Sequence, residues 1–213
     1  MTKFIFVRHG ESIGNALRVL LGHTDFDLSE LGYAQAAATA KALSCEKIDY
    51  IYSSDLLRAY NTALPNAELR GIDVSKNENL RELYLGEWEG KSVSDILSAY
   101  GDMYDKDWLG GFGTFRCPDG ESTKEAGQRF YNECEKIAQR HPDNTVLIAS
   151  HAAVLRSFFA IILEIPPEEI ASRLAFPSNA SYSEAYFDNG KFTMGRFSVD
   201  GHLREIGITK FGS

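Results

Sequence analysis

The sequence predicts an α/β protein: a three-layer α/β/α sandwich with a mostly parallel central sheet and a C-terminal antiparallel hairpin. Two observations favour this class. Short apolar runs alternate with longer helical segments, which is the rhythm of strand, helix and strand in a parallel sheet. Two of the runs, at 4–7 and 145–149, are apolar apart from Thr145, as expected of strands that are buried on both faces.

The first half of the chain contains two predicted strand–helix pairs. The strand at 4–7 is followed, after a loop, by an alanine-rich helix for which Ser29 is the expected N-cap. The second strand, at 48–52, leads into a helix over about 56–67. We expect this helix to stop near Pro65, because proline disrupts the helical hydrogen-bond pattern.

The second half of the chain begins irregularly, with a loop over about 80–90 and a stretch rich in glycine and aromatic residues at 101–120. We expect the whole chain, 1–213, to form one domain with a lid-like insertion around 91–121. The remaining predicted elements are a short helix at 92–100, a long amphipathic helix at 123–140, a strand at 145–149, a buried helix at 154–163 and a hairpin at 182–197 that turns at Asn189-Gly190.

The composition is that of an ordinary globular protein, with 44% hydrophobic and 24% charged residues. A net charge of -8 argues against a nucleic-acid-binding protein, whose footprint would be basic. Cys45, Cys117 and Cys134 lack the spacing of a zinc site or a disulfide framework, so we expect free thiols and a cytoplasmic location. No apolar run has the length of a membrane span. The composition leaves a monomer and a homodimer equally open.

Chemically active side chains follow the predicted strands where those strands end. Arg8 and His9 follow the first strand, Arg58 follows the second, His151 follows a later one, and Glu82 lies in a loop. The carboxyl ends of parallel strands meet at one edge of a sheet, so we expect these residues to lie together. Two guanidiniums can hold a tetrahedral dianion and keep a nearby imidazole neutral, and a neutral imidazole can attack phosphorus. A carboxyl group can donate and accept the proton.

Five motifs in order carry a family resemblance. The chain resembles the histidine phosphatase superfamily, in its phosphoglycerate mutase-like branch, over about residues 4–179. That resemblance implies the phosphoglycerate mutase-like form of the sandwich. The motifs are Arg8-His9-Gly10-Glu11 with Asn15; Ser53-Ser54-Asp55-Leu56 with Arg58-Ala59; Glu82 with Gly86 and Trp88-Glu89-Gly90; Gly120-Glu121-Ser122; and Ser150-His151.

The resemblance implies a role for each matching residue. His9 would be the nucleophile that becomes phosphohistidine, and Glu82 would be the proton donor. The family uses no metal, and we expect no cofactor; the expected partner is a small phosphorylated substrate. The residues that would bind the transferring phosphoryl group or the substrate phosphate are Arg8, Asn15, Gly22, Arg58 and His151.

Some side chains have competing interpretations. We interpret His23 and Asp25 as loop contacts rather than a metal pair, because no further ligand cluster supports them. The acidic alternatives to the proposed proton donor are Glu11, Glu87 and Glu89, of which the last more simply orders its own loop. The irregular stretch forms a packed flap at the sheet edge, a lid that contacts substrate, or both at once; its aromatic residues are Tyr104, Trp108, Phe112 and Phe115.

The activity we expect is that of a metal-independent, histidine acid-type phosphomonoesterase acting on small organic phosphates. One alternative is a cofactor-dependent phosphoglycerate mutase, which returns the phosphoryl group to its substrate. Mutases of the family carry an adjacent Arg-Arg pair after the acid, whereas the span 82–121 contains only Lys91, Lys106 and Arg116 as cations. The other alternative is an inactive protein that binds a phosphorylated ligand, and the complete set of site residues argues against it.

Overall fold

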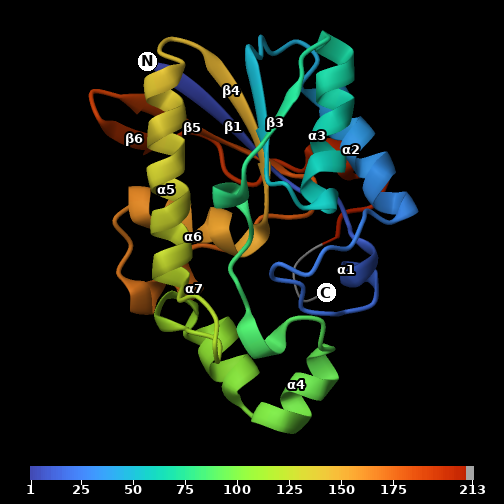
Figure 1. The fold of residues 1–213 in the computed structure, drawn as a ribbon, viewed down its shortest axis with the longest axis vertical. Helices are drawn as coiled ribbons and strands as arrows, with labels where there is room; N and C mark the ends of the chain where they lie inside the picture. The colour runs from blue at the N-terminus through green and yellow to red at the C-terminus, as the bar shows by residue number, and fades with distance from the viewer. Residues whose placement is uncertain (210–213) are drawn as a thin grey trace.

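The computed structural model describes residues 1–209 and is built on a six-stranded sheet (Figure 1). Its strands are β1 (Thr2–Arg8), β2 (Tyr50–Ser53), β3 (Val74–Lys76), β4 (Thr145–Ser150), β5 (Tyr182–Asp188) and β6 (Lys191–Met194). They lie in the order β3-β2-β4-β1-β5-β6. The first four pair in parallel, whereas β5 pairs antiparallel with β1, and β6 antiparallel with β5. The mostly parallel sheet and the C-terminal hairpin are therefore confirmed.

Helices cover both faces of this sheet, as Figure 1 shows. They are α1 (Ile13–Ala16), α2 (Glu30–Ala42), α3 (Leu57–Arg70), α4 (Val93–Tyr100), α5 (Thr123–Arg140), α6 (Ala152–Ile162) and α7 (Ile170–Arg173). The side chains of β1 alternate between two cores. Phe4 and Phe6 pack in the core that includes α5 and α6, whereas Ile5 and Val7 pack in the core that includes α3. This double burial explains why the run at 4–7 within β1 is apolar throughout.

The helix α3 differs from its prediction, because it continues through Pro65 to Arg70. Ala67, two residues beyond the proline, is buried in the core beneath α3, and this burial favours a helix that continues past Pro65. Gly71, with φ at 63°, then provides the left-handed residue at which the helix ends. The expected cap of α2 is confirmed, since the Ser29 side chain accepts a hydrogen bond from the backbone N–H of Gly32. The strand β3 was not predicted, because it is short and largely exposed.

The stretch at 101–120 is packed rather than open. It contains a π-helical turn at Tyr104–Gly110 and a 3₁₀ turn at Phe112–Thr114. In Figure 1 it lies with α4 beyond the carboxyl ends of the parallel strands, far from the N-terminus. The contacts of this stretch are those of a packed flap, because its aromatic side chains belong to the main core together with Trp88. The buried aromatic residues are Tyr104, Trp108, Phe112 and Phe115.

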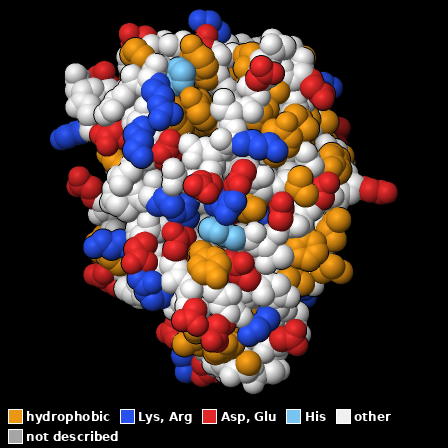
Figure 2. All heavy atoms as spheres, viewed as in Figure 1, with side chains coloured by type: hydrophobic (Ala, Val, Ile, Leu, Met, Phe, Trp, Pro, Cys, Tyr) orange, Lys and Arg blue, Asp and Glu red, His pale blue; other side chains and the backbone are white. Residues whose placement is uncertain are grey.

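Within residues 1–209, no helix is long and apolar enough to cross a membrane. The same residues contain no group of three or more His, Cys, Asp or Glu side chains arranged to hold a metal ion. Cys45, Cys117 and Cys134 are free thiols, as expected. On the face in Figure 2, basic and acidic side chains are interspersed.

Candidate active site

The two histidines lie side by side because the strands that precede them are neighbours. Arg8 of β1 is in register with Ser150 of β4, and the backbone N–H of His9 donates to the Ser150 carbonyl at 2.9 Å. The rings of His9 and His151 consequently lie 5.2 Å apart between centroids. A Cβ on Gly10 would lie 2.5 Å from the carbonyl oxygen of Gly32, so the loop after β1 packs directly against the start of α2.

The His9 ring is buried and held in one tautomer. Its Nδ1 lies 2.7 Å from the carbonyl oxygen of Gly10. A carbonyl only accepts, so Nδ1 carries the proton and Nε2 carries the lone pair. Burial lowers the pKa of His9 well below its usual value of 6.5, and the charges of Arg58 and Arg8 lower it further, against a smaller opposing effect of the Gly10 hydrogen bond. The ring is therefore a neutral imidazole with a free basic nitrogen.

Two guanidiniums are buried beside this ring. Arg58 donates to the carbonyl oxygens of Thr24 and Gly22 at 2.8 and 2.7 Å, and Arg8 donates to the carbonyl oxygen of Pro177 at 2.6 Å. The Nε atom of each arginine is buried without a hydrogen-bond partner within residues 1–209. Burial lowers the pKa of both groups to about 10, while Glu82 raises it, so both stay charged at neutral pH. Buried cations with unused donors favour an anion as ligand.

Gly22 supports Arg58 through its backbone. Its φ of 51° is left-handed, and a Cβ there would overlap the carboxylate of Glu89. That carboxylate accepts hydrogen bonds from the N–H groups of His23 and Leu85 at 2.6 and 3.1 Å, so Glu89 does order its own loop. The loop in turn directs the Gly22 carbonyl at Arg58.

The carboxylate of Glu82 is held at the start of α6. Its Oε1 accepts from the N–H of Leu83 at 2.9 Å and of Val154 at 2.8 Å, and its Oε2 accepts from the N–H of Ala153 at 3.1 Å. The first turn of a helix has unpaired N–H groups and a positive end, which suits a carboxylate. Oε2 accepts the single bond and therefore retains the greater capacity to handle a proton.

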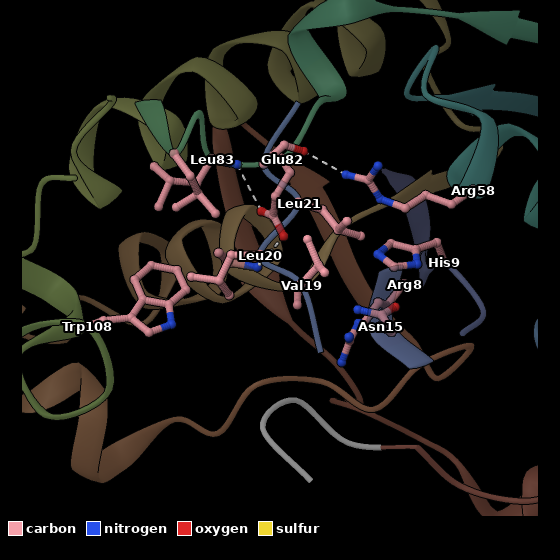
Figure 3. Close-up of a pocket in the computed structure, with 14 residues that line it drawn as sticks. Arg8, His9, Asn15, Val19, Leu20, Leu21, Arg58, Glu82, Leu83 and Trp108 are labelled. Carbon is pink, nitrogen blue, oxygen red and sulfur yellow. Dashed lines mark hydrogen bonds between the residues drawn. The ribbon is translucent and has the colours of Figure 1, made fainter. Parts of the chain in front are cut away.

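These groups line one cavity, as Figure 3 shows for the labelled side chains. The cavity encloses about 40 Å³, room for roughly three water molecules, and so for a phosphoryl group and little more. Its other walls are apolar and include Leu20, Leu21, Leu83 and Trp108. The sequence-predicted residues that line it are Arg8, His9, Asn15, Gly22, Arg58 and Glu82.

His151 lies against the His9 ring rather than in the cavity wall. Both of its ring nitrogens are buried without a hydrogen-bond partner within residues 1–209. Burial, followed by the charge of Arg58, lowers its pKa well below 6.5. A neutral imidazole keeps one N–H donor, and this donor has no protein acceptor here.

The acidic alternatives point elsewhere. Glu87 accepts from the Tyr100 hydroxyl at 2.6 Å, and Glu11 accepts from the Ser29 hydroxyl at 2.7 Å. None of the alternatives lines the cavity. The interpretation of His23 and Asp25 as loop contacts is confirmed: His23 Nε2 lies 2.8 Å from the Glu82 carbonyl oxygen, and Asp25 accepts from the N–H of Leu57 at the start of α3.

Sequence reasoning missed two residues that hold the site from a distance. Asn179 donates to the His9 carbonyl at 3.1 Å and to the Asn15 side chain at 3.3 Å. Arg129, on α5, donates to the Glu82 carbonyl at 3.0 Å. Neither lies in a recognisable motif. Arg129 lies two turns into the helix that follows Glu121, and an arginine there is an ordinary helix residue by its pattern alone.

Comparison with known proteins identifies a matching family and similar relatives. The model of the histidine phosphatase superfamily (branch 1) matches residues 4–200. "Phosphoserine phosphatase 1" of Hydrogenobacter thermophilus is 32% identical, over 97% of this chain and 96% of its own length. "Probable phosphoglycerate mutase GpmB" of Yersinia pestis is 31% identical, over 78% of this chain and 77% of its own.

Solved structures share the fold. YhfR of Bacillus stearothermophilus superimposes with a TM-score of 0.89 at 29% identity, covering 96% of this chain and 100% of its own. Phosphoserine phosphatase of Entamoeba histolytica, solved in complex with 3-phosphoglyceric acid, gives a TM-score of 0.80 at 28% identity, covering 95% of this chain and 100% of its own. Both likenesses extend over nearly the whole chain.

Proposed function

The chain belongs to the histidine phosphatase superfamily, branch 1, and we propose that it hydrolyses small organic phosphomonoesters through a phosphohistidine formed on His9. One observation carries the proposal. The unprotonated Nε2 of a neutral, buried His9 shares a cavity of phosphoryl size with two buried arginines. The phosphatase names among its relatives support the same reaction class.

In the first step, His9 Nε2 attacks phosphorus and the bond from phosphorus to the ester oxygen breaks. Arg8 and Arg58 stabilise the charge on the transferring group, and His151 donates its N–H to a phosphoryl oxygen. The Glu82 carboxyl group gives its proton to the departing oxygen, so that the alcohol leaves neutral. Asn15 completes the phosphate contacts from the loop after β1.

In the second step, water attacks the phosphorus of phosphohistidine. Glu82, now a carboxylate, takes a proton from that water, and the bond between phosphorus and Nε2 breaks. Inorganic phosphate leaves, and His9 returns to the neutral form. The cycle requires no cofactor, because the two arginines provide the positive charge.

A mutase is less well supported by this site. Of the cations in the span 82–121, Lys106 pairs with Asp102 at 2.6 Å and Arg116 pairs with Glu125 near the start of α5. Neither these two nor Lys91 lines the phosphoryl cavity. No cation of this span is therefore placed to hold a glycerate carboxylate between two transfers.

The remaining organisation belongs to the same proposal. We place the whole chain in one domain in the cytoplasm, with residues 91–121 as a lid. Two contacts support the lid: Trp108 lines the phosphoryl cavity, and Tyr104 lines a neighbouring cavity. Residues 210–213 of that domain lie outside the described residues.

The test is to trap the intermediate. Enzyme mixed rapidly with excess ³²P-labelled phosphomonoester and quenched in alkali should retain about one label per active site, and acid should release it. The variant His9→Ala should retain no label and lose several powers of ten in turnover. His141→Gln, a histidine change at the far end of the sheet, is the matched control. Labelled and active His9→Ala would overturn the proposal.

A further inference from the structure

A second, larger cavity adjoins the phosphoryl cavity. It encloses about 640 Å³. Arg8, Asn15, Val19 and Leu20 line both cavities, and Figure 3 shows these four side chains in the wall of the first. A phosphomonoester with its phosphoryl group in the small cavity has its organic part directed along this shared wall. The larger cavity is therefore where the leaving group is recognised.

One cation reaches the second cavity without a protein partner. Arg18 is exposed, and its side chain makes no hydrogen bond or ion pair with any residue in 1–209. Its backbone, in contrast, is fixed: its N–H donates to the Asn15 carbonyl at 3.0 Å, and its carbonyl accepts from Val93 at 3.2 Å. A guanidinium on an anchored backbone, at the edge of a cavity, is placed to meet an anionic group of a ligand.

One anion reaches the same cavity, also without a partner. Asp105 is exposed on the π-helical turn, and its side chain forms no hydrogen bond or ion pair within the described residues. The nearest cation in sequence, Lys106, pairs with Asp102 instead, at 2.6 Å. Arg18 and Asp105 are also too far apart to pair with each other, since no ion pair within 4.0 Å joins them. A ligand in this cavity therefore meets both charges separately.

We propose that the second cavity binds the organic part of a phosphorylated amino acid, with Arg18 holding its carboxylate and Asp105 its ammonium group. This rests on the proposed phosphatase activity of the adjoining cavity. A purely anionic substrate such as a phosphoglycerate would gain from Arg18 but be repelled by Asp105. A neutral sugar phosphate would use neither charge.

The rest of the lining suits the same ligand. Ser92 and Ser94 provide hydroxyl groups, and the other walls are the apolar side chains Leu17, Val93, Leu97 and Leu109. The volume exceeds what the three carbons of serine need. The cavity therefore accommodates phosphothreonine as well as phosphoserine, with the added methyl group on an apolar wall.

The test compares four phosphomonoesters by kcat/KM. O-phosphoserine has both head groups, 3-phosphoglycerate has the carboxylate without the ammonium, O-phosphoethanolamine has the ammonium without the carboxylate, and p-nitrophenyl phosphate has neither. Arg18→Gln should lower the ratio of kcat/KM for phosphoserine to that for p-nitrophenyl phosphate about tenfold, and do the same for 3-phosphoglycerate but not for phosphoethanolamine. Asp105→Asn should lower the phosphoserine and phosphoethanolamine ratios about tenfold, and leave or raise that of 3-phosphoglycerate.

The controls are changes of the same type outside both cavities, Arg140→Gln and Asp107→Asn, for which all ratios should match those of the wild type. Wild-type phosphoserine ratios that persist in both Arg18→Gln and Asp105→Asn would overturn the amino-acid site and leave the phosphatase activity standing. Equal ratio losses on all three organic substrates would overturn it too, because the charges would not be recognised separately. A wild-type enzyme without p-nitrophenyl phosphatase activity would instead refute the proposed function.

Discussion

The backbone carbonyl of Glu82 accepts a hydrogen bond from Nη2 of Arg129 at 3.0 Å. The same guanidinium forms a two-pronged contact with the Glu121 carboxylate, at 2.9 Å from Nε and 2.8 Å from Nη2. Its Nη1 donates to the carbonyls of Asn79 and Arg81 at 2.9 and 3.1 Å. One planar group on α5 thus fixes the backbone on which the proposed proton donor lies.

Arg129→Lys should therefore slow the enzyme by misplacing that donor. A lysine cannot contact all these acceptors with one fixed geometry. Displacement of a catalytic group by about 1 Å can cost up to about a hundredfold in rate, so we expect kcat on alkyl phosphates to fall about ten- to a hundredfold. The loss on p-nitrophenyl phosphate should be much smaller, because its leaving group, p-nitrophenolate, departs without needing a proton.

Arg140→Lys, on the same helix, is the control for Arg129→Lys and should behave as the wild type. If Arg129→Lys lowered the melting temperature and slowed both substrates alike, Arg129 would serve the fold and not the position of the acid. Steady-state kinetics beside a thermal melt separates these results.

Glu82→Gln should show the same substrate dependence more strongly. Glutamine has no proton to give, and its amide NH₂ can replace Oε2 only by facing the N–H of Ala153. Because a poor leaving group depends most on protonation, the slope of log kcat against leaving-group pKa should become steeper in the variant. A series of substituted phenyl and alkyl phosphates measures that slope. An unchanged slope would transfer the acid role to another carboxyl group, with Glu11 and Glu87 next to examine.

The sequence predicted the parts of this protein that depend on local pattern. The apolar runs predicted β1 and β4, and serine caps predicted where α2 begins. Strand pairing then places the two histidines, because β1 and β4 are parallel neighbours and each is followed directly by a histidine, His9 and His151. What failed was decided by tertiary contacts: α3 extends past Pro65 because Asn66 and Ala67, just beyond the proline, are buried.

The supporting residues of the site had no local signal at all. Arg129 and Asn179 act through backbone carbonyls that are distant in the sequence, and a carbonyl has no sequence identity. Arg18 and Asp105 line the same cavity only because the loop after β1 and the flap pack together. Periodicity and motif spacing describe neither kind of relationship.

Removal of divalent metals should leave the activity intact. The positive charge in the phosphoryl cavity comes from Arg8 and Arg58, whose pKa of about 10 keeps both charged at neutral pH. After dialysis against EDTA, kcat should stay within about a factor of two, which is well under 1 kcal/mol of barrier. A large loss that Mg²⁺ or Zn²⁺ restores would mean that the site has been misread.

Phosphoglycerate should be hydrolysed faster than it is isomerised. Arg116, the cation nearest in sequence to the end of the flap, is held by Glu125 and by the Gly120 carbonyl outside both cavities. A phosphate-release assay and a coupled mutase assay, run on one enzyme preparation with 2,3-bisphosphoglycerate present, compare the two rates. Mutase turnover above hydrolysis would reverse the assignment, and Arg18 would then be the first residue to test as the carboxylate ligand.

The buried histidines should make the fold sensitive to mild acid. In the folded protein the pKa of His9 and of His151 lies well below 6.5, whereas in the unfolded chain both return to about 6.5. As the pH falls below 6.5, the unfolded chain takes up protons that the folded protein does not. Each histidine's contribution to stability is thus fully present above pH 6.5 and is lost as the pH falls, at up to about 1.4 kcal/mol per pH unit.

His9→Asn removes one of these two contributions and isolates it. The free energy of unfolding, measured by urea titration at pH 6.5, 6.0 and 5.5 in phosphate-free buffer, should fall less steeply with pH in the variant, by about 1.4 kcal/mol per unit at most. His141→Gln is the control, since His141 is more exposed and burial lowers its pKa less. In the unfolded chain, Asp and Glu carboxyl groups have pKa values near 4, so they contribute little to the pH dependence of stability between pH 5.5 and 6.5. Equal slopes in His9→Asn and the wild type would show that His9 takes up its proton at the same pH in the folded enzyme as in the unfolded chain, and that burial and the two arginines do not keep its imidazole neutral in mild acid.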